Sequence, residues 1–291
     1  MDERYLEKLP RFSWAEFKKH VDAGTPFEAI SPIATTLIRV KRYDPCIALA
    51  VHAGHRLREE SLSKMTIEET ERLQDEDVAT EHMIQDFPIQ LVGLDSRYEY
   101  DLNRRRDQSV YLKPFQSWGK KVWLHPPSKE ELDISYQKYD EFYEMLDCVA
   151  EQMTARFGKF LVFDVHSYNF RRQQYVGREQ ALPTFNIAAS AADQKKHRAV
   201  LDQIAQNLAK VRLTNADSKV KENDIFKKDG AVVAALEKKC PDALTVPIEI
   251  KKIYTDERTG DVNRAMIEVL RRGIFSAATE AAALMGLPLN P

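Results

Sequence analysis

Short apolar runs alternate with longer amphipathic stretches along this chain, a pattern typical of α/β proteins. Several runs are apolar almost throughout, as expected for strands of a sheet that helices cover on both faces. We therefore predict an α/β three-layer sandwich with a mixed, largely parallel central sheet. The runs that predict strands are residues 35–40, 47–52, 89–94, 160–165, 184–188 and 244–250.

The clearest helix is predicted over residues 129–157, where apolar side chains recur at steps of three and four. Ser128 and Glu131 have capping-box spacing at its start, and Gly158 stops it. Further amphipathic stretches predict helices over residues 66–85, 193–211, 230–239 and 261–285.

Length and composition favour one folded domain over residues 1–291, with residues 1–29 as an N-terminal extension. Two polar stretches, residues 103–127 and 168–183, are predicted active-site loops, because long loops inside a compact domain are often functional. The formal net charge of −2 argues against binding of nucleic acid or anionic membrane. Three well-separated cysteines, a charged N-terminus and the lack of a long apolar stretch favour a cytoplasmic protein. The oligomeric state stays open.

Two of the apolar runs lead into histidines, His52 and His166. Binding crevices of open α/β sheets form at the carboxyl ends of strands. Strand alternation puts Asp164 on the same side as His166, where a carboxylate can accept the second ring N–H of a metal-bound imidazole. A hydrolytic zinc takes three protein ligands and keeps one position open for water, so a carboxylate is the natural third ligand. Residues 74–82 offer several acids, and composition does not choose among them.

Further polar residues predict how a substrate is bound and how a proton is transferred. Arg104 beside Asn103 suits a carboxylate, because a guanidinium grips both oxygens while the amide adds a directed donor. Glu249 lies between two isoleucines, where a carboxylate is costly to bury unless it is paired or used. Burial would raise its pKa and suit it to proton transfer. A structural salt bridge to Lys251 or Lys252 is the alternative.

Taken in order, these segments resemble the N-formylglutamate amidohydrolase family, within the zinc carboxypeptidase and phosphorylase/hydrolase-like fold group that includes aspartoacylase. The resemblance implies that His52 and His166 bind Zn²⁺ or another divalent transition metal. It favours Glu81 as the third ligand, with Asp77 as the second choice. The residues that carry it are His52-Ala53-Gly54, Ser96-Arg97-Tyr98, Asp101-Leu102-Asn103-Arg104, Asp164-Val165-His166-Ser167, Pro183-Thr184-Phe185-Asn186-Ile187 and Ile248-Glu249.

The resemblance also implies roles in hydrolysis of a small N-acyl amino acid such as N-formylglutamate. Glu249 would be the general base and acid, and Arg97 would polarise the scissile carbonyl. Asn103 and Arg104 would hold the substrate carboxylate. This chain departs from the family, which commonly has no second histidine after the glycine, by having His55. Because the spacing from His52 to His55 resembles the paired-ligand spacing of the carboxypeptidases, His55 is an alternative to Glu81 as the third ligand. Two other functions remain open, a carboxypeptidase-like peptidase and a metal-binding or ligand-binding module that has lost catalysis.

Overall fold

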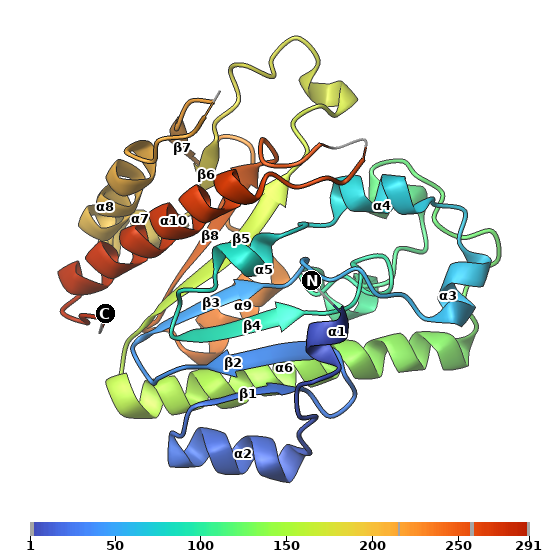
Figure 1. Cartoon of the computed structure of the whole chain (residues 1–291), viewed down its shortest axis with the longest axis horizontal. Helices are drawn as coiled ribbons and strands as arrows, with labels where there is room; N and C mark the ends of the chain where they lie inside the picture. Colours follow the sequence, from blue (N-terminus) through green and yellow to red (C-terminus); the bar gives the residue numbers. More distant parts are fainter. Residues whose placement is uncertain (1–2, 215, 257–258, 290–291) are drawn as a thin grey trace.

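The computed structural model describes residues 3–214, 216–256 and 259–289. Within these residues one eight-stranded sheet has the strand order β1-β2-β4-β3-β5-β8-β6-β7 (Figure 1). Strand β3 is parallel to β4 and β5, β5 is parallel to β8, and β6 is parallel to β7. The pairs β1–β2, β2–β4 and β6–β8 are antiparallel. The sheet is therefore mixed, as predicted. The strands are β1 (Phe27–Ile30), β2 (Thr36–Val40), β3 (Cys46–Ala50), β4 (Ile89–Gly93), β5 (Leu161–Tyr168), β6 (Phe185–Ile187), β7 (Val220–Glu222) and β8 (Leu244–Lys251).

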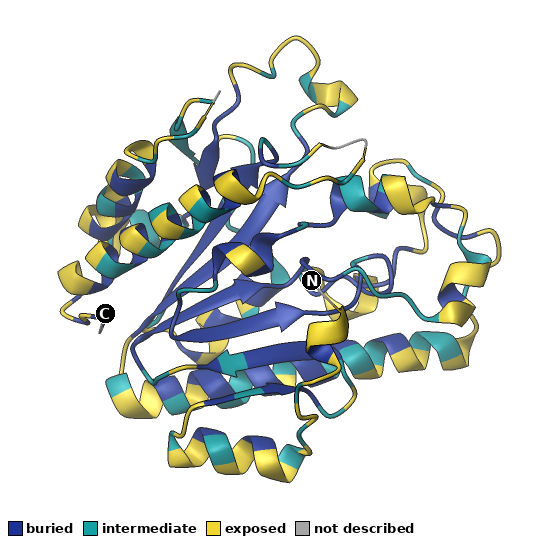
Figure 2. Cartoon of the chain, viewed as in Figure 1, coloured by how far each residue is buried: buried dark blue, intermediate teal, exposed yellow. Residues whose placement is uncertain are grey.

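Helices cover both faces of the sheet. One apolar core packs α5 (Thr80–Met83), α8 (Arg198–Ala209) and α10 (Arg264–Leu284) on one face. The other packs α2 (Trp14–Ala23), α6 (Lys129–Phe157) and α9 (Ala231–Lys239) on the opposite face. Figure 2 shows buried strands between helices that are buried only on their inner sides. The three-layer sandwich is confirmed. Shorter helices are α1 (Glu3–Leu6), α3 (Glu59–Lys64), α4 (Glu69–Asp75), α7 (Ala191–Lys196), η1 (Arg106–Gln108), η2 (Pro114–Ser117) and η3 (Gln173–Tyr175).

The long helix α6 begins and ends at the predicted residues. The Ser128 side chain accepts from the Glu131 main-chain N–H, and Glu131 accepts from the Ser128 N–H at 2.6 Å, which completes the capping box. Gly158 terminates the helix with a φ of 71°, a left-handed conformation that favours glycine.

Three predicted elements differ from the structure near the candidate site. Strand β5 continues to Tyr168, so His166 lies within the strand, whereas β3 ends at Ala50, two residues before His52. The helix predicted over residues 66–85 is two short helices, α4 and α5. The break ends at Ala79, whose φ of 67° no right-handed helix accommodates.

Other differences lie further from the candidate site. The helix predicted over residues 193–211 is divided at His197 into α7 and α8. Strands β1 and β7 were not predicted, and β1 belongs to the segment expected as an N-terminal extension. Residues 1–2 of that extension lie outside the described residues. No helix in the described ranges has the length and apolarity needed to cross a bilayer.

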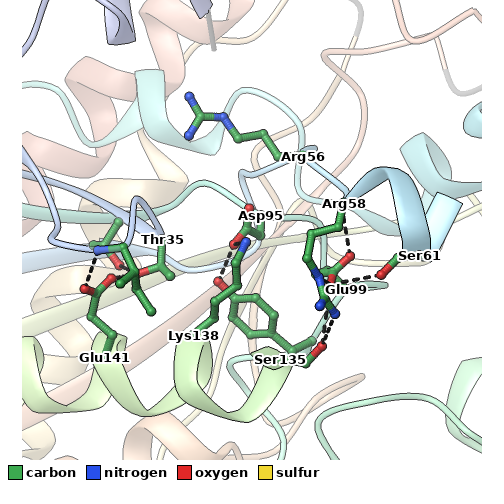
Figure 3. Close-up of polar contacts among 12 residues, drawn as sticks. Thr35, Arg56, Arg58, Ser61, Asp95, Glu99, Ser135, Lys138 and Glu141 are labelled. Carbon is green, nitrogen blue, oxygen red and sulfur yellow. Dashed lines mark hydrogen bonds and ion pairs between the residues drawn. The ribbon is translucent and has the colours of Figure 1, made fainter. Parts of the chain in front are cut away.

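Polar contacts attach α6 to loops at the carboxyl edge of the sheet (Figure 3). The Glu141 carboxylate accepts hydrogen bonds from side-chain and main-chain donors of the β1–β2 turn. Lys138 lies 3.0 Å from Asp95, and Arg58 links Glu99 to α6 by donating to the Glu99 carboxylate at 2.5 Å and to the Ser135 hydroxyl at 2.8 Å. Since Asp95 and Glu99 follow β4 closely, these contacts fix the loop that leads from β4 into the candidate site.

Candidate metal centre and active site

Three buried side chains from separate segments meet at the carboxyl edge of the sheet. His52 follows β3, His166 lies in β5, and Asp77 lies between α4 and α5. They are 3%, 3% and 1% exposed, respectively. Asp77 Oδ2 lies 3.1 Å from His166 Nδ1 and 3.4 Å from His52 Nδ1. Two imidazole nitrogens and one carboxylate are a donor set that Zn²⁺ accepts in hydrolases.

The sheet and one close backbone contact bring the two histidines together. Strands β3 and β5 are parallel neighbours, so the chain leaves both at the same edge of the sheet. After β3 the chain turns tightly against the end of β4. A Cβ on Gly54 would lie 2.3 Å from the carbonyl carbon of Leu94, so glycine is required there. The His52-Ala53-Gly54 sequence therefore places His52 by allowing this close approach.

Asp77 occupies the place expected for Glu81. Because the chain leaves the helical path after α4, Asp77 turns toward the histidines, whereas Glu81 lies in α5 outside the group. Glu81 Oε1 lies 3.6 Å from His82 Nε2. The alternative ligand His55 is also outside the group. Its Nδ1 contacts Glu76, and its Nε2 lies 3.2 Å from Glu69.

In each histidine, a carboxylate lies within ion-pair distance of Nε2, the ring nitrogen that points away from Asp77. His52 Nε2 lies 2.7 Å from Asp101 Oδ1, and His166 Nε2 lies 3.0 Å from Asp164 Oδ2. Both Nδ1 atoms therefore face Asp77. Among the described residues, the buried His52 Nδ1 has no hydrogen-bond partner, as expected of a ring nitrogen that binds a metal ion. The residues present fit a divalent zinc-type ion.

The charges in this group keep its carboxylates ionised. Burial acts to raise the pKa of Asp77, but the hydrogen bond from His166 and the charges of His52 and His166 hold that pKa well below its usual range. For Asp101, burial is likewise outweighed by Arg97 and His52, and the pKa lies well below its usual value. Burial acts to lower the pKa of His166, but Asp164 raises it well above the usual value. Ionised carboxylates are the form in which a metal ion is bound.

Glu249 lies beside the candidate metal group, which is made of His52, Asp77 and His166. Strands β5 and β8 place it opposite His166 in register. Its neighbours in β8 are buried, but Glu249 itself is partly exposed and lines a cavity. Burial raises the pKa of Glu249 to about 8, with the charge of His166 opposing the shift and that of Asp77 adding to it. A carboxyl group with such a pKa can both accept and donate a proton near neutral pH.

The metal group opens into a cavity of about 580 Å³, which lies in the range of small-molecule sites. Arg97 lines its wall and donates to Asp101 Oδ2 at 2.7 Å and to the Tyr111 hydroxyl at 3.1 Å. Arg104, whose side chain is 43% exposed, also lines the cavity. Asn103 Nδ2 lies 3.5 Å from His166 Nε2. The residues predicted to bind substrate are thus gathered at one cavity.

Several residues of this cavity were not identified from the sequence. The sequence analysis assigns no role to Asp101, although its position four residues after Arg97 is a signal for an ion pair between the two. Arg172 reaches from the loop after β5 to the Asp75 carboxylate, and its guanidinium lies 3.9 Å from the ring centroid of Trp118. No local pattern links residues so far apart in the sequence.

Comparison with known proteins matches most of the chain to a protein family. The family model of N-formylglutamate amidohydrolase matches residues 44–254. The comparison with curated proteins gave no match.

Solved structures resemble the chain at low sequence identity. The N-formylglutamate amidohydrolase from Ralstonia eutropha JMP134 is 15% identical, with a TM-score of 0.69 over 87% of this chain and 99% of that chain. A gene product from Agrobacterium tumefaciens is 15% identical, with a TM-score of 0.58 over 84% and 95% of the respective chains. These likenesses show a shared fold. Because the family match covers most of the sequence, from before His52 to beyond Glu249, the chain belongs to the N-formylglutamate amidohydrolase family.

Proposed function

We propose that this chain is a zinc-dependent amidohydrolase that cleaves the amide bond of a small N-acyl amino acid such as N-formylglutamate. The observation that carries the proposal is the buried group of His52, Asp77 and His166 with Glu249 beside it. Membership of the family supports amide hydrolysis. Three protein ligands leave a coordination position open, as hydrolytic zinc sites do.

His52 and His166 would hold the ion through Nδ1, and Asp77 through its carboxylate. When bound, zinc lowers the pKa of a water molecule and polarises a carbonyl group. Asp101 and Asp164 keep the proton of each imidazole on Nε2, which leaves Nδ1 free to coordinate.

Glu249 performs the proton transfers. It takes a proton from the attacking water and delivers it to the leaving amine, which requires a group that changes protonation state near neutral pH. A pKa of about 8 before metal binding places Glu249 in that range. The positive charge of a bound ion lowers this pKa and favours the basic form first.

The arginines provide the substrate contacts in this proposal. Arg104 and Asn103 hold the carboxylate of the amino acid at the cavity mouth. Arg97 uses three of its five N–H donors within the protein, on Asp101, Tyr111 and the Asp75 carbonyl. Its remaining donors can stabilise negative charge on the carbonyl oxygen, a contribution commonly of about 3 kcal/mol for a well-placed donor.

The test combines zinc content with turnover. Wild-type protein should bind about one zinc per chain and hydrolyse N-formyl-L-glutamate, and His166→Ala should lose the zinc. The matched control His82→Ala, on an exposed histidine, should keep it. Glu249→Gln should retain zinc and lose roughly 10²–10⁴-fold in kcat.

The other outcomes separate the alternatives. Wild-type protein without zinc after reconstitution would refute the metal-dependent mechanism. Bound zinc without turnover of any N-acyl amino acid or dipeptide would favour a binding module. Faster cleavage of dipeptides than of N-formyl amino acids would favour a peptidase.

A further inference from the structure

Lys252 is a buried cation that the proposed chemistry does not use. It directly follows β8 and is 2% exposed, although lysine is almost never fully buried unless it is paired. Its Nζ donates to two main-chain carbonyl oxygens, those of Gln74 and Glu76, each at 2.6 Å. Burial lowers the pKa of this ammonium, so its position has an energetic cost that these contacts offset.

The two carbonyls belong to the end of α4, just before Asp77. Carbonyl groups in the last turn of a helix have no partner within the helix and need donors from elsewhere. Arg97 donates to the carbonyl between them, that of Asp75, at 3.2 Å. Asp77 in turn donates its own N–H to the His52 carbonyl at 2.9 Å. The side chains of Lys252 and Arg97 and the main-chain carbonyl of His52 thus fix the path of the chain into Asp77.

We propose that Lys252 is a positioning residue that clamps residues 74–76 so that the Asp77 carboxylate faces His52 and His166 before any metal binds. The inference rests on the proposed metal-dependent function. Lys252 follows Glu249 by three residues, so one stretch of backbone sets the position of both the proton-transfer group and the metal-ligand segment. Without the two hydrogen bonds from Lys252, the carbonyls of Gln74 and Glu76 would need water as a partner, and Asp77 would adopt other positions.

The first measurement is the zinc dissociation constant of metal-free protein, from competition with a chromophoric chelator. Lys252→Met keeps the apolar stem and removes the donor, and it should weaken zinc binding roughly 10–100-fold, as loss of outer-shell support does elsewhere. The matched control is Lys251→Met. Lys251 is also buried and also donates to a carbonyl, but to that of Glu179 in a different loop. The control should bind zinc as wild type does.

A double-mutant cycle shows whether Lys252 acts through Asp77. If it does, Lys252→Met should change zinc affinity little in an Asp77→Asn background, because the ligand it positions is already lost. Additive losses would overturn the inference, and so would equal losses in Lys252→Met and the Lys251→Met control. If Lys252→Met does not fold, Lys252→Gln replaces it, since glutamine is too short and uncharged to support both carbonyls.

Hydrogen exchange of the metal-free protein gives a readout without zinc. In Lys252→Met the peptide covering residues 74–78 should exchange faster while other peptides keep the wild-type rate. Faster exchange throughout the protein would mean general destabilisation and overturn the inference, as would unchanged exchange over residues 74–78. Absence of zinc binding in wild type would instead refute the proposed function, so the two failures are distinguishable.

Discussion

Asp164→Asn perturbs the metal group through a single contact. Asp164 is fully buried in β5, and its Oδ2 lies 3.0 Å from His166 Nε2. Apart from this ion pair, its two carboxylate oxygens have no polar partner among the described residues, so His166 is its main polar contact. Asparagine has nearly the same shape and can still accept the His166 N–H, but it carries no negative charge. The substitution therefore removes charge support from His166 while leaving the packing unchanged.

The expected loss is one to two orders of magnitude in zinc affinity. A carboxylate partner fixes the imidazole tautomer and raises its basicity, and its removal typically costs 10–100-fold, or about 1.4–2.7 kcal/mol. The loss should depend on pH. In the metal-free wild type, burial lowers the pKa of His166 but Asp164 raises it well above the usual value, so protons compete with zinc. Because Asp164→Asn lowers that pKa, proton competition weakens and the difference from wild type should shrink as the pH falls.

The assay is chelator competition for zinc at several pH values from mildly acidic to mildly alkaline, on wild type, Asp164→Asn and Asp147→Asn. Asp147 lies on α6 away from the cavity, 3.8 Å from Lys239, and serves as the matched control. Wild-type affinity in Asp164→Asn would refute the reasoning, and so would a loss that is constant across the pH range. A similar loss in Asp147→Asn would show that the effect is not specific to the metal group.

Three further predictions follow from the same geometry. Asp77→Asn should bind zinc much more weakly than wild type whereas Glu81→Gln should bind it equally well, and the reverse result in chelator competition would identify Glu81 as the ligand. Gly54→Ala should destabilise the fold by about 1–3 kcal/mol and weaken zinc binding, because the added methyl meets backbone; unchanged urea unfolding would contradict this. The Glu76 contact raises the pKa of His55 above 6.5, so His55 stabilises the folded protein fully below pH 6.5 and loses this effect as the pH rises through the folded-state pKa. The stability difference between wild type and His55→Gln should therefore shrink at alkaline pH, and a difference independent of pH would contradict it.

Much of the fold and part of the site could be predicted because they depend on local patterns. Apolar runs and helical periodicity are set by neighbours in sequence, so the sandwich and the bounds of α6 followed directly. Parallel strands leave the sheet at one edge, so the meeting of His52 and His166 followed from topology alone. The register of β8 then placed Glu249 beside them.

The third member of the metal group could not be predicted in this way. Residues 66–85 have the composition of one helix, and on such a helix Glu81 is a reasonable ligand. The helix ends early because donors from distant segments, Lys252 and Arg97, satisfy its last carbonyls, and because Ala79 adopts a left-handed conformation. Neither cause is visible in the local sequence, since the donor Lys252 lies far along the chain.

Asp101 connects metal binding with substrate binding in a way that Asp164 does not. Its Oδ1 contacts the metal-group residue His52, while its Oδ2 accepts from Arg97, the residue proposed to stabilise the reacting carbonyl. The Tyr111 hydroxyl also donates to this carboxylate. Removing Asp101 would leave the Arg97 guanidinium without its paired charge as well as loosening His52, so its effects on metal affinity and turnover would be inseparable. The Asp164 carboxylate pairs with the imidazole of His166 and not with Arg97, and for that reason Asp164→Asn tests metal affinity without removing the charge partner of Arg97.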